Sequence, residues 1–238
     1  MQKILSRVRR AVDDYNMIED GDRIAVGVSG GKDSLTLLLA LSQLKRFYPK
    51  KFEVIGLSLN MGFEGVSFDN VKDMCERKGI EYHVKDTDIA EVVFDVRNEK
   101  NPCSLCAKMR RGGLNDFAVE MGCNKVALGH HNEDVLETFF LSLFYEGRLN
   151  CFSPVTYLSR RDIHVIRPLI YVPEGEIKRI SSQLELPIVK NPCPMDGVSK
   201  RQDMKEFIYE KKKEDKFFKT KIMHAIQTGL PQWSKRDV

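Results

Sequence analysis

The stretch Arg23-Ile24-Ala25-Val26-Gly27-Val28-Ser29-Gly30-Gly31-Lys32-Asp33-Ser34 decides the fold. Its first half is apolar and β-branched, which predicts a buried strand, and the leucines after its second half recur at helical spacing. A glycine-rich turn between a strand and a helix surrounds one anion with backbone N–H groups and the positive end of the helix. The sequence therefore predicts a polyphosphate site in residues 29–34, although a plain strand-to-helix turn would also use glycines.

The side chains of this loop suit a bound phosphate chain. Ser29 and Ser34 supply hydroxyl donors, Lys32 adds positive charge, and Asp33 offers a carboxylate to Mg²⁺. The two adjacent glycines allow the backbone to approach a ligand closely. The spacing differs from the Walker motif, which has four residues between its glycines and then Lys-Ser/Thr.

Strands and helices alternate along the rest of the chain. Apolar runs predict strands at residues 52–59, 80–84, 125–130 and 164–169, and helical patterns occupy 71–78, 109–121, 135–145 and 174–184. This alternation predicts an α/β fold with a doubly wound parallel sheet that binds ligands at the carboxyl ends of its strands. We assign Asn60 and Gly129, which lie at such ends, to the phosphate site. Three parts are expected: a basic N-terminal helix (1–20), a phosphate-binding domain (21–190), and a C-terminal segment (191–238) with a charged helix.

Composition favours a globular protein of the cytoplasm. The chain has 238 residues, of which 42% are hydrophobic and 30% charged, and it has neither a signal-peptide pattern nor an apolar run of membrane-spanning length. The net charge of +4 suits a polyanionic partner without requiring one. The lysine-rich helix expected between residues 203 and 227 is either a solvated face or a contact for nucleic-acid phosphates.

Three of the six cysteines invite a chemical explanation. Cys103-Ser104-Leu105-Cys106 forms a C-x-x-C pair, and Cys193 follows 87 positions after Cys106 in a turn stiffened by two prolines. The three thiols suit a zinc site completed by a histidine such as His130, a redox dithiol, or an iron–sulfur cluster with one iron left open. The other three cysteines are expected to be packing residues.

Charged side chains surround the predicted site. Gly129-His130-His131-Asn132-Glu133-Asp134 lies where the fourth predicted strand gives way to a helix, so its acids reach the edge that carries the phosphate loop, or cap the helix. His130 suits a buried histidine as well as a ligand. Lys108, Arg110 and Arg111 follow the C-x-x-C pair and suit either RNA phosphate or an exposed basic face.

These motifs resemble a known family. Ser29-Gly30-Gly31-Lys32-Asp33-Ser34 is similar to the loop of the PP-loop ATP pyrophosphatases. The C-x-x-C followed by Arg110-Arg111-Gly112, then residues 127–134, Phe144-Tyr145-Glu146-Gly147 and Ile166-Arg167-Pro168-Leu169, resemble the tRNA 2-thiocytidine synthetase family in order, from about Gly21 to Gln202. The chain departs from that pattern at Asp196, where the family often has a cysteine, and around Met61, where it looks shorter.

The resemblance implies a fold, a reaction and a set of ligands. The fold would be the adenine nucleotide alpha-hydrolase-like PP-loop fold with N-terminal and C-terminal helical extensions. The reaction would be adenylation of the C2 oxygen of cytidine 32 in the tRNA anticodon loop and its replacement by sulfur, with release of AMP and pyrophosphate. By matching position, Cys103, Cys106 and Cys193 would bind a [4Fe–4S] cluster, while Asp134 and Arg110 would be catalytic.

The resemblance also implies partners and leaves rivals. ATP and Mg²⁺ would bind at the phosphate loop, tRNA would be the substrate, and a sulfur donor such as a cysteine desulfurase and a second copy of the chain would be partners. No membrane association is expected. The rivals are thiolation of a tRNA uridine, another AMP-forming reaction such as amidation, and a non-catalytic nucleotide-binding redox module.

Overall fold

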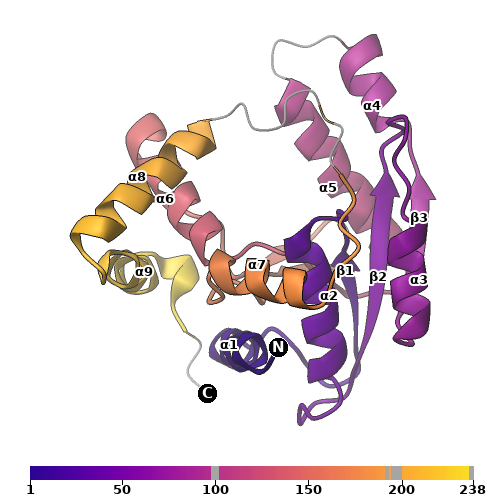
Figure 1. The fold of residues 1–238 in the computed structure, drawn as a ribbon, viewed down its shortest axis with the longest axis horizontal. Helices are drawn as coiled ribbons and strands as arrows, with labels where there is room; N and C mark the ends of the chain where they lie inside the picture. Colours follow the sequence, from indigo (N-terminus) through magenta and orange to yellow (C-terminus); the bar gives the residue numbers. More distant parts are fainter. Residues whose placement is uncertain (98–101, 191–192, 194–199, 236–238) are drawn as a thin grey trace.

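A mostly parallel sheet forms the centre of the protein (Figure 1). The computed structural model describes residues 1–97, 102–190, 193 and 200–235. The sheet has six strands in the order β3-β2-β1-β4-β6-β5. Their bounds are β1 Asp22–Gly27, β2 Phe52–Asn60, β3 Glu81–Asp86, β4 Lys125–Ala127, β5 Val155–Leu158 and β6 Ile163–Ile166. All neighbouring strands are parallel except β5, which runs antiparallel to β6 at one edge.

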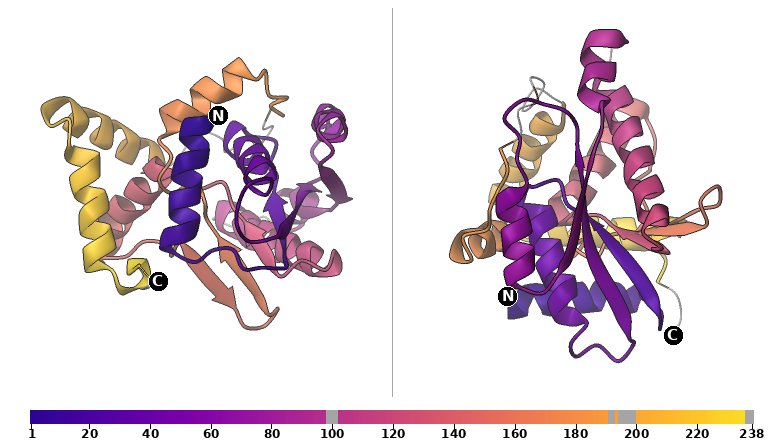
Figure 2. Two further views of the ribbon diagram at one scale, coloured as in Figure 1. Left: turned by 90° about the horizontal axis from the view of Figure 1, so that it is seen from below. Right: turned by 90° about the vertical axis from the view of Figure 1, so that its right-hand side faces the viewer.

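Helices cover both faces of the sheet, which confirms the doubly wound α/β fold (Figure 2). The α-helices are α1 Gln2–Asp14, α2 Lys32–Leu44, α3 Asp69–Arg77, α4 Ile89–Glu91, α5 Pro102–Glu120, α6 Asn132–Glu146, α7 Glu174–Gln183, α8 Lys200–Glu214 and α9 Phe218–Gly229. Residues Val92–Val96 form a short π-helix after α4, and Pro231–Trp233 form a 3₁₀ turn.

Alternation along the central strand explains the two cores. Ile24 and Val26 of β1 point into a large core that α1, α2, α3, α6 and α7 share, while Ala25 points into a smaller core. Phe117 and Ala118 of α5 close the smaller core. Because strand side chains alternate between faces, a fully apolar strand needs cover on both sides, and the sequence pattern therefore predicted this architecture.

Helical extensions flank the sheet at both ends of the chain. The apolar stripe of α1, which includes Ile4 and Val8, is buried in the large core, and the buried Met204 of α8 and Ile226 of α9 extend that core on the side of α6. The expected C-terminal helical region is two helices with a turn at residues 215–217. No helix in the described ranges has the length and hydropathy needed to span a membrane.

The structure differs from the sequence expectations in two places that concern the site. Helix α5 begins at Pro102, seven residues earlier than expected, so Cys103 and Cys106 lie in its first turns and not in a preceding loop. Proline suits a first helical turn because it has no N–H to leave unpaired. The antiparallel strand β5 was not expected, because it is only four residues long and is not fully buried.

Candidate functional site

The phosphate loop (residues 29–34) joins β1 to α2 and is held by its own serines. The Ser29 N–H donates to Ser34 Oγ at 3.2 Å, and Ser34 Oγ donates to the Gly31 carbonyl at 2.9 Å. The two hydroxyl oxygens are 3.2 Å apart. These bonds fold the loop around the first turn of α2, where backbone N–H groups have no helical partner. The loop is therefore shaped to receive an anion.

The only lysine of this loop is already ion-paired. Lys32 Nζ lies 2.9 Å from Asp33 Oδ2 and 3.1 Å from Oε1 of Glu174, the first residue of α7. Burial lowers the pKa of Lys32, but the bonds and charges of Asp33 and Glu174 outweigh burial and raise it. Lys32 is thus a cation at neutral pH, balanced by carboxylates that a phosphate chain can replace.

Two glycines allow other segments to pack against the loop. Gly30 has a φ of +81°, and a Cβ there would come within 2.6 Å of Val189 Cβ. A Cβ on Gly129 would come within 3.1 Å of backbone atoms of Asp33 and Ser34. A side chain at either position would push a neighbouring segment away, so these glycines fix how the turn after β4 and residues near Val189 meet the loop.

A buried histidine connects the loop with the acidic turn after β4. His131 is 4% exposed, its Nε2 lies 3.8 Å from Asp33 Oδ1, and its Nδ1 lies 3.5 Å from both Glu133 Oε2 and Asp134 Oδ2. Burial lowers the pKa of His131, but the surrounding carboxylates, Glu133 first, more than offset this and raise it. The imidazole therefore sits among three carboxylates from two segments.

The two acids of this turn have different partners. Asp134 Oδ2 accepts the His131 N–H at 2.8 Å, which caps α6, and Asp134 Oδ1 accepts from Arg201 Nη1 of α8 at 3.1 Å. Glu133 accepts from Lys219 at 2.7 Å and from the Glu174 N–H at 2.8 Å. Burial raises the pKa of Glu133, but hydrogen bonds from His131 and Lys219 lower it to about 2.

A third carboxyl on α6 is buried beside this pair. Glu137 is fully buried, neither of its oxygens has a hydrogen-bond partner, and its nearest cation is Arg201, 3.7 Å from Oε2. Burial, and next the charge of Asp134, raises the pKa of Glu137 to about 7. A buried carboxyl without a donor is unusual, and its surroundings favour its neutral form.

The side chains of Asn60 and His130 contact other residues of the chain. Asn60 ends β2, where its Nδ2 donates to Asp86 Oδ1 at 2.9 Å, so its side chain ties two strand ends together at the carboxyl edge. The His130 ring packs on Phe152 with centroids 5.0 Å apart. Burial, and then the charge of Arg167, lowers the pKa of His130 to about 4. His130 is thus a neutral, half-buried histidine in this structure.

Cys106 feels the charges of both other cysteines singled out in the sequence. Burial raises the pKa of the Cys106 thiol, the charges of Cys193 and Cys103 raise it further, and the charge and side-chain hydrogen bond of Arg110 act in the opposite direction. Cys103 is exposed, while Cys106 and Cys193 are half-buried. Cys75, Cys123 and Cys151 are buried elsewhere, as expected for packing residues.

The cysteine group fits a cluster better than a single ion. Among the described residues, no three His, Cys, Asp or Glu side chains are close enough together to hold one metal ion, and His130 packs on Phe152 instead. In a four-iron cluster each thiolate binds a different iron, so the ligands stand further apart than around one zinc. The absence of a single-ion arrangement among the described residues does not conflict with that requirement.

The path of the chain relates this cysteine group to the edge of the sheet that carries the phosphate loop. Helix α5 begins after β3 and ends before β4, which places its first turns at the carboxyl edge of the parallel sheet. The Val189 N–H donates to the Gly30 carbonyl at 3.0 Å. Cys193 follows four residues later, a span of at most about 14 Å. Cys193 therefore lies within about 14 Å of the Val189 contact with the loop, and its charge acts on Cys106 in the first turns of α5.

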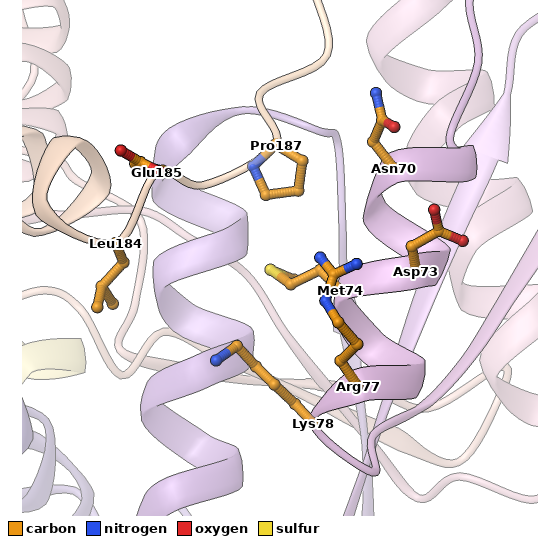
Figure 3. Close-up of a pocket in the computed structure, with 8 residues that line it drawn as sticks. All are labelled: Asn70, Asp73, Met74, Arg77, Lys78, Leu184, Glu185 and Pro187. Atoms are coloured by element: carbon orange, nitrogen blue, oxygen red, sulfur yellow. The ribbon is translucent and has the colours of Figure 1, made fainter.

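Two hollows lie on the described part of the chain, and the second adjoins the acidic turn after β4. One of about 480 Å³ lies between α3 and residues 184–187 (Figure 3), and its lining contains no predicted site residue. Another, of about 410 Å³, is bordered by α6, α7, α8 and Lys219 of α9. Glu133 and Glu137 form part of its wall. Neither hollow contains a loop residue or a cysteine in its lining.

The basic residues of the C-terminal helices are partly neutralised. Lys211 pairs with Glu214 at 2.8 Å, and Lys221 pairs with Asp215 at 2.6 Å. Lys108 and Arg111 of α5 are exposed, and Arg111 Nε donates to the Ala107 carbonyl. These contacts agree with solvated faces over much of α8 and α9.

Sequence reasoning missed three residues that complete the site: His131, Glu174 and Arg201. Each contacts a predicted site residue from a distant part of the chain. For His131 and Glu174, the only indication in the sequence was that each follows the end of a predicted strand. Nothing near Arg201 in the sequence indicated a partner.

Comparison with known proteins identifies the family. A family model described as the PP-loop domain matches residues 2–211. The chain is 37% identical over 235 residues to a tRNA-cytidine(32) 2-sulfurtransferase of Geobacter sulfurreducens, covering 98% of this chain and 91% of that protein. It is 40% identical over 238 residues to the protein of the same name from Stutzerimonas stutzeri, covering 96% of this chain and 86% of that protein.

Among solved structures, the U34-tRNA thiolase NcsA from Methanococcus maripaludis with its [4Fe-4S] cluster matches with a TM-score of 0.80 and 26% identity, covering 95% of this chain and 77% of that chain. A non-catalytic module does not agree with this membership, and the chain belongs to the PP-loop enzyme family of the tRNA-cytidine(32) 2-sulfurtransferases.

Proposed function

We propose that this chain uses ATP to adenylate the C2 oxygen of cytidine 32 in a tRNA anticodon loop and replaces that oxygen by sulfur. The observation that supports the proposal is that Val189, four residues before Cys193, bonds to the phosphate loop, while Cys106 in α5 feels the charges of Cys103 and Cys193. A nucleotide loop alone would suit many AMP-forming reactions. Thiolates beside it suit sulfur delivery, and the curated relatives carry the name of this reaction.

The phosphate loop would bind the triphosphate. Its backbone N–H groups and the hydroxyls of Ser29 and Ser34 would donate to phosphate oxygens, with Gly31 and Gly129 keeping the approach open. Lys32 would leave Glu174 and pair with a phosphate, an exchange of one anion for another. Asn60 would border the nucleotide from the end of β2.

Asp33 and Asp134 would act on the α phosphate from neighbouring segments. Asp33 Oδ1 is buried and has no hydrogen-bond partner, which suits a Mg²⁺ ligand. The ion would neutralise charge on the phosphates. His131 between Asp33 and Asp134 would keep the two carboxylates together.

The chemical step would be attack of the cytidine C2 oxygen on the α phosphorus. The bond to the bridging oxygen breaks, pyrophosphate leaves, and the base carries AMP as a leaving group. Arg110, at the first turns of α5, would stabilise the growing negative charge, and Asp134 would serve as the acidic group of this step. A sulfur nucleophile then adds at C2 and the bond to AMP breaks.

Cys103, Cys106 and Cys193 would hold a [4Fe–4S] cluster. With three protein ligands, such a cluster would have one iron without a protein ligand, and it would supply the sulfur chemistry at this edge. The charge and hydrogen bond of Arg110 act to lower the pKa of Cys106, whereas burial raises it and is the larger effect, so Arg110 would assist ionisation of this thiol when it binds iron. A cysteine desulfurase is proposed as sulfur donor, a homodimer as the assembly and the cytoplasm as the location.

Nucleoside analysis tests the proposal. Purified protein with its cluster, ATP, Mg²⁺, sulfide and tRNA should produce 2-thiocytidine, AMP and pyrophosphate in equal amounts, measured by mass spectrometry and chromatography. Cys193→Ser should lose 2-thiocytidine and the iron–sulfur absorbance while keeping its affinity for ATP. Cys123→Ala, which removes a buried cysteine at the far end of α5, is the matched control and should keep the activity.

One alternative has a specific observation in its favour. The solved structure that matches over 95% of this chain is a thiolase of tRNA uridine 34. The same assay separates the two substrates, because 2-thiouridine would then appear in place of 2-thiocytidine. Production of neither thionucleoside, with an intact cluster and bound ATP, would refute tRNA thiolation.

A further inference from the structure

The end of α6 exposes aromatic and apolar side chains that the proposed mechanism does not use. Phe144 is 52% exposed, Tyr145 47% and Leu149 69%. One turn earlier on the same helix, Phe140 is 5% exposed. Because a soluble chain buries most large apolar side chains, a group of three exposed ones near a site indicates a contact surface.

Two cations border this surface. Lys200, the first residue of α8, places its Nζ 4.2 Å from the centroid of the Tyr145 ring. Arg148 follows the left-handed Gly147 that ends α6, and its side chain is exposed. Within the described ranges, no carboxylate forms an ion pair with either cation. Glu146, the one acid between residues 144 and 150, accepts a hydrogen bond from Ser142.

The surface adjoins the proposed catalytic residues. Arg201, the neighbour of Lys200, donates to Asp134 at 3.1 Å, so adjacent residues of α8 contact the proposed catalytic acid and the Tyr145 ring. Tyr145 lies about 16 Å along α6 from Asp134. Figure 1 shows the start of α8 lying beside α6. A loop that presents one base to the site would extend over this distance.

An exposed aromatic ring flanked by cations has the chemistry of a single-stranded RNA contact. Unpaired bases stack on such rings, and lysine and arginine pair with the phosphates that follow. We propose that Tyr145, with Lys200 and Arg148, forms a stacking platform for an unpaired base of the tRNA anticodon loop other than the modified one. This inference rests on the proposed function, because it takes the substrate to be an RNA loop.

A second copy of the chain fits this surface less well than RNA does. A two-fold contact would bring Lys200 and Arg148 of both copies towards each other without acids to balance them. Three exposed apolar side chains also provide far less area than the roughly 800 Å² per partner of a stable interface. Phosphates supply the missing negative charge.

Binding of an anticodon stem–loop RNA tests the platform. The cluster-loaded protein is titrated into fluorescently labelled RNA that carries cytidine at position 32, and Kd is read from anisotropy. Tyr145→Ala should raise Kd roughly 10-fold, as expected for one lost base stack, while Tyr145→Phe should stay within about 2-fold of the original protein. Affinity for ATP should not change in either variant.

The matched control is on the same helix as Lys200. Tyr209 is 61% exposed and has Lys213 Nζ 4.3 Å from its ring centroid, so it repeats the pair about 14 Å further along α8. Tyr209→Ala should leave Kd unchanged. Lys200→Gln and Arg148→Gln should each reduce the slope of log Kd against log salt by about 0.7.

Three results would overturn the platform. Unchanged RNA binding by Tyr145→Ala would do so, as would equal weakening by Tyr145→Ala and Tyr209→Ala. A loss of dimer in sedimentation with RNA affinity intact would assign the surface to a second copy. If the unaltered protein neither binds the RNA nor thiolates it, the proposed function itself fails, which is a different outcome from a variant that binds and thiolates normally.

Discussion

Replacing Glu137 by glutamine should stabilise the protein at alkaline pH and not at acidic pH. Burial raises the pKa of Glu137 from 4.5 to about 7, and its two oxygens have no hydrogen-bond donor. Because the folded-state pKa exceeds the unfolded value, stability from neutral Glu137 is complete below about 4.5 and is lost as pH rises through about 7. The pKa difference corresponds to a loss of about 3 kcal/mol by pH 8. Glutamine keeps the shape and cannot ionise.

Urea unfolding of both proteins between about pH 4.5 and about pH 8 measures this effect. Reducing buffer with a chelator keeps metal binding out of the comparison. The midpoint difference between Glu137→Gln and the original protein should grow by on the order of 1 M urea over the range. Glu146→Gln, which removes a charge from the exposed end of the same helix, is the control for net charge. A midpoint difference that stays constant with pH would refute the assignment of a neutral buried Glu137.

Three further changes test other parts of the site. Arg201→Gln removes one of the cations that lower the pKa of Glu137, the other main one being Lys205, so the pH at which stability falls should move above about 7 in the same urea series. Lys125→Met leaves Asp22 buried without the ammonium that now lies 2.7 Å away, and should lower the unfolding free energy by about 3 kcal/mol at neutral pH; a change below about 1 kcal/mol would contradict the buried pair. Gly129→Ala places a Cβ within 3.1 Å of backbone at the start of α2 and should weaken ATP binding, measured by calorimetry, about 10-fold while cluster absorbance is retained. Gly30→Ala, which also displaces Val189, should reduce both ATP binding and cluster absorbance. Equal effects of the two variants would argue against separate contacts.

The sheet was predictable because its evidence is local. Buried parallel strands are apolar throughout, and each is followed by a helix with its own periodicity, so β1, β2 and β4 stand out in the sequence. The start of α5 was missed because only Phe117 and Ala118 near its other end are buried, and its first turns carry no apolar stripe. Strand β5 was missed because a four-residue half-buried edge strand leaves almost no pattern.

The same contrast between local and non-local evidence applies to the residues of the site. The phosphate loop could be predicted because all its chemistry lies within six consecutive residues. His131, Glu174 and Arg201 act through partners that the fold brings from far along the chain, and a single sequence gives no means of pairing one charge with another. Glu137 is the extreme case, because its importance lies in having no partner, which only burial reveals.

The link between the two halves of the site passes through Gly30. Its left-handed backbone shapes the phosphate loop, its carbonyl accepts the Val189 N–H, and its missing Cβ makes room for the Val189 side chain. Val189 is four residues before Cys193, so little chain separates the loop contact from the third proposed cluster ligand. Occupancy of the loop by a nucleotide and the position of the Cys193 thiol are therefore expected to be coupled, with the shared contact at Gly30 as the physical connection.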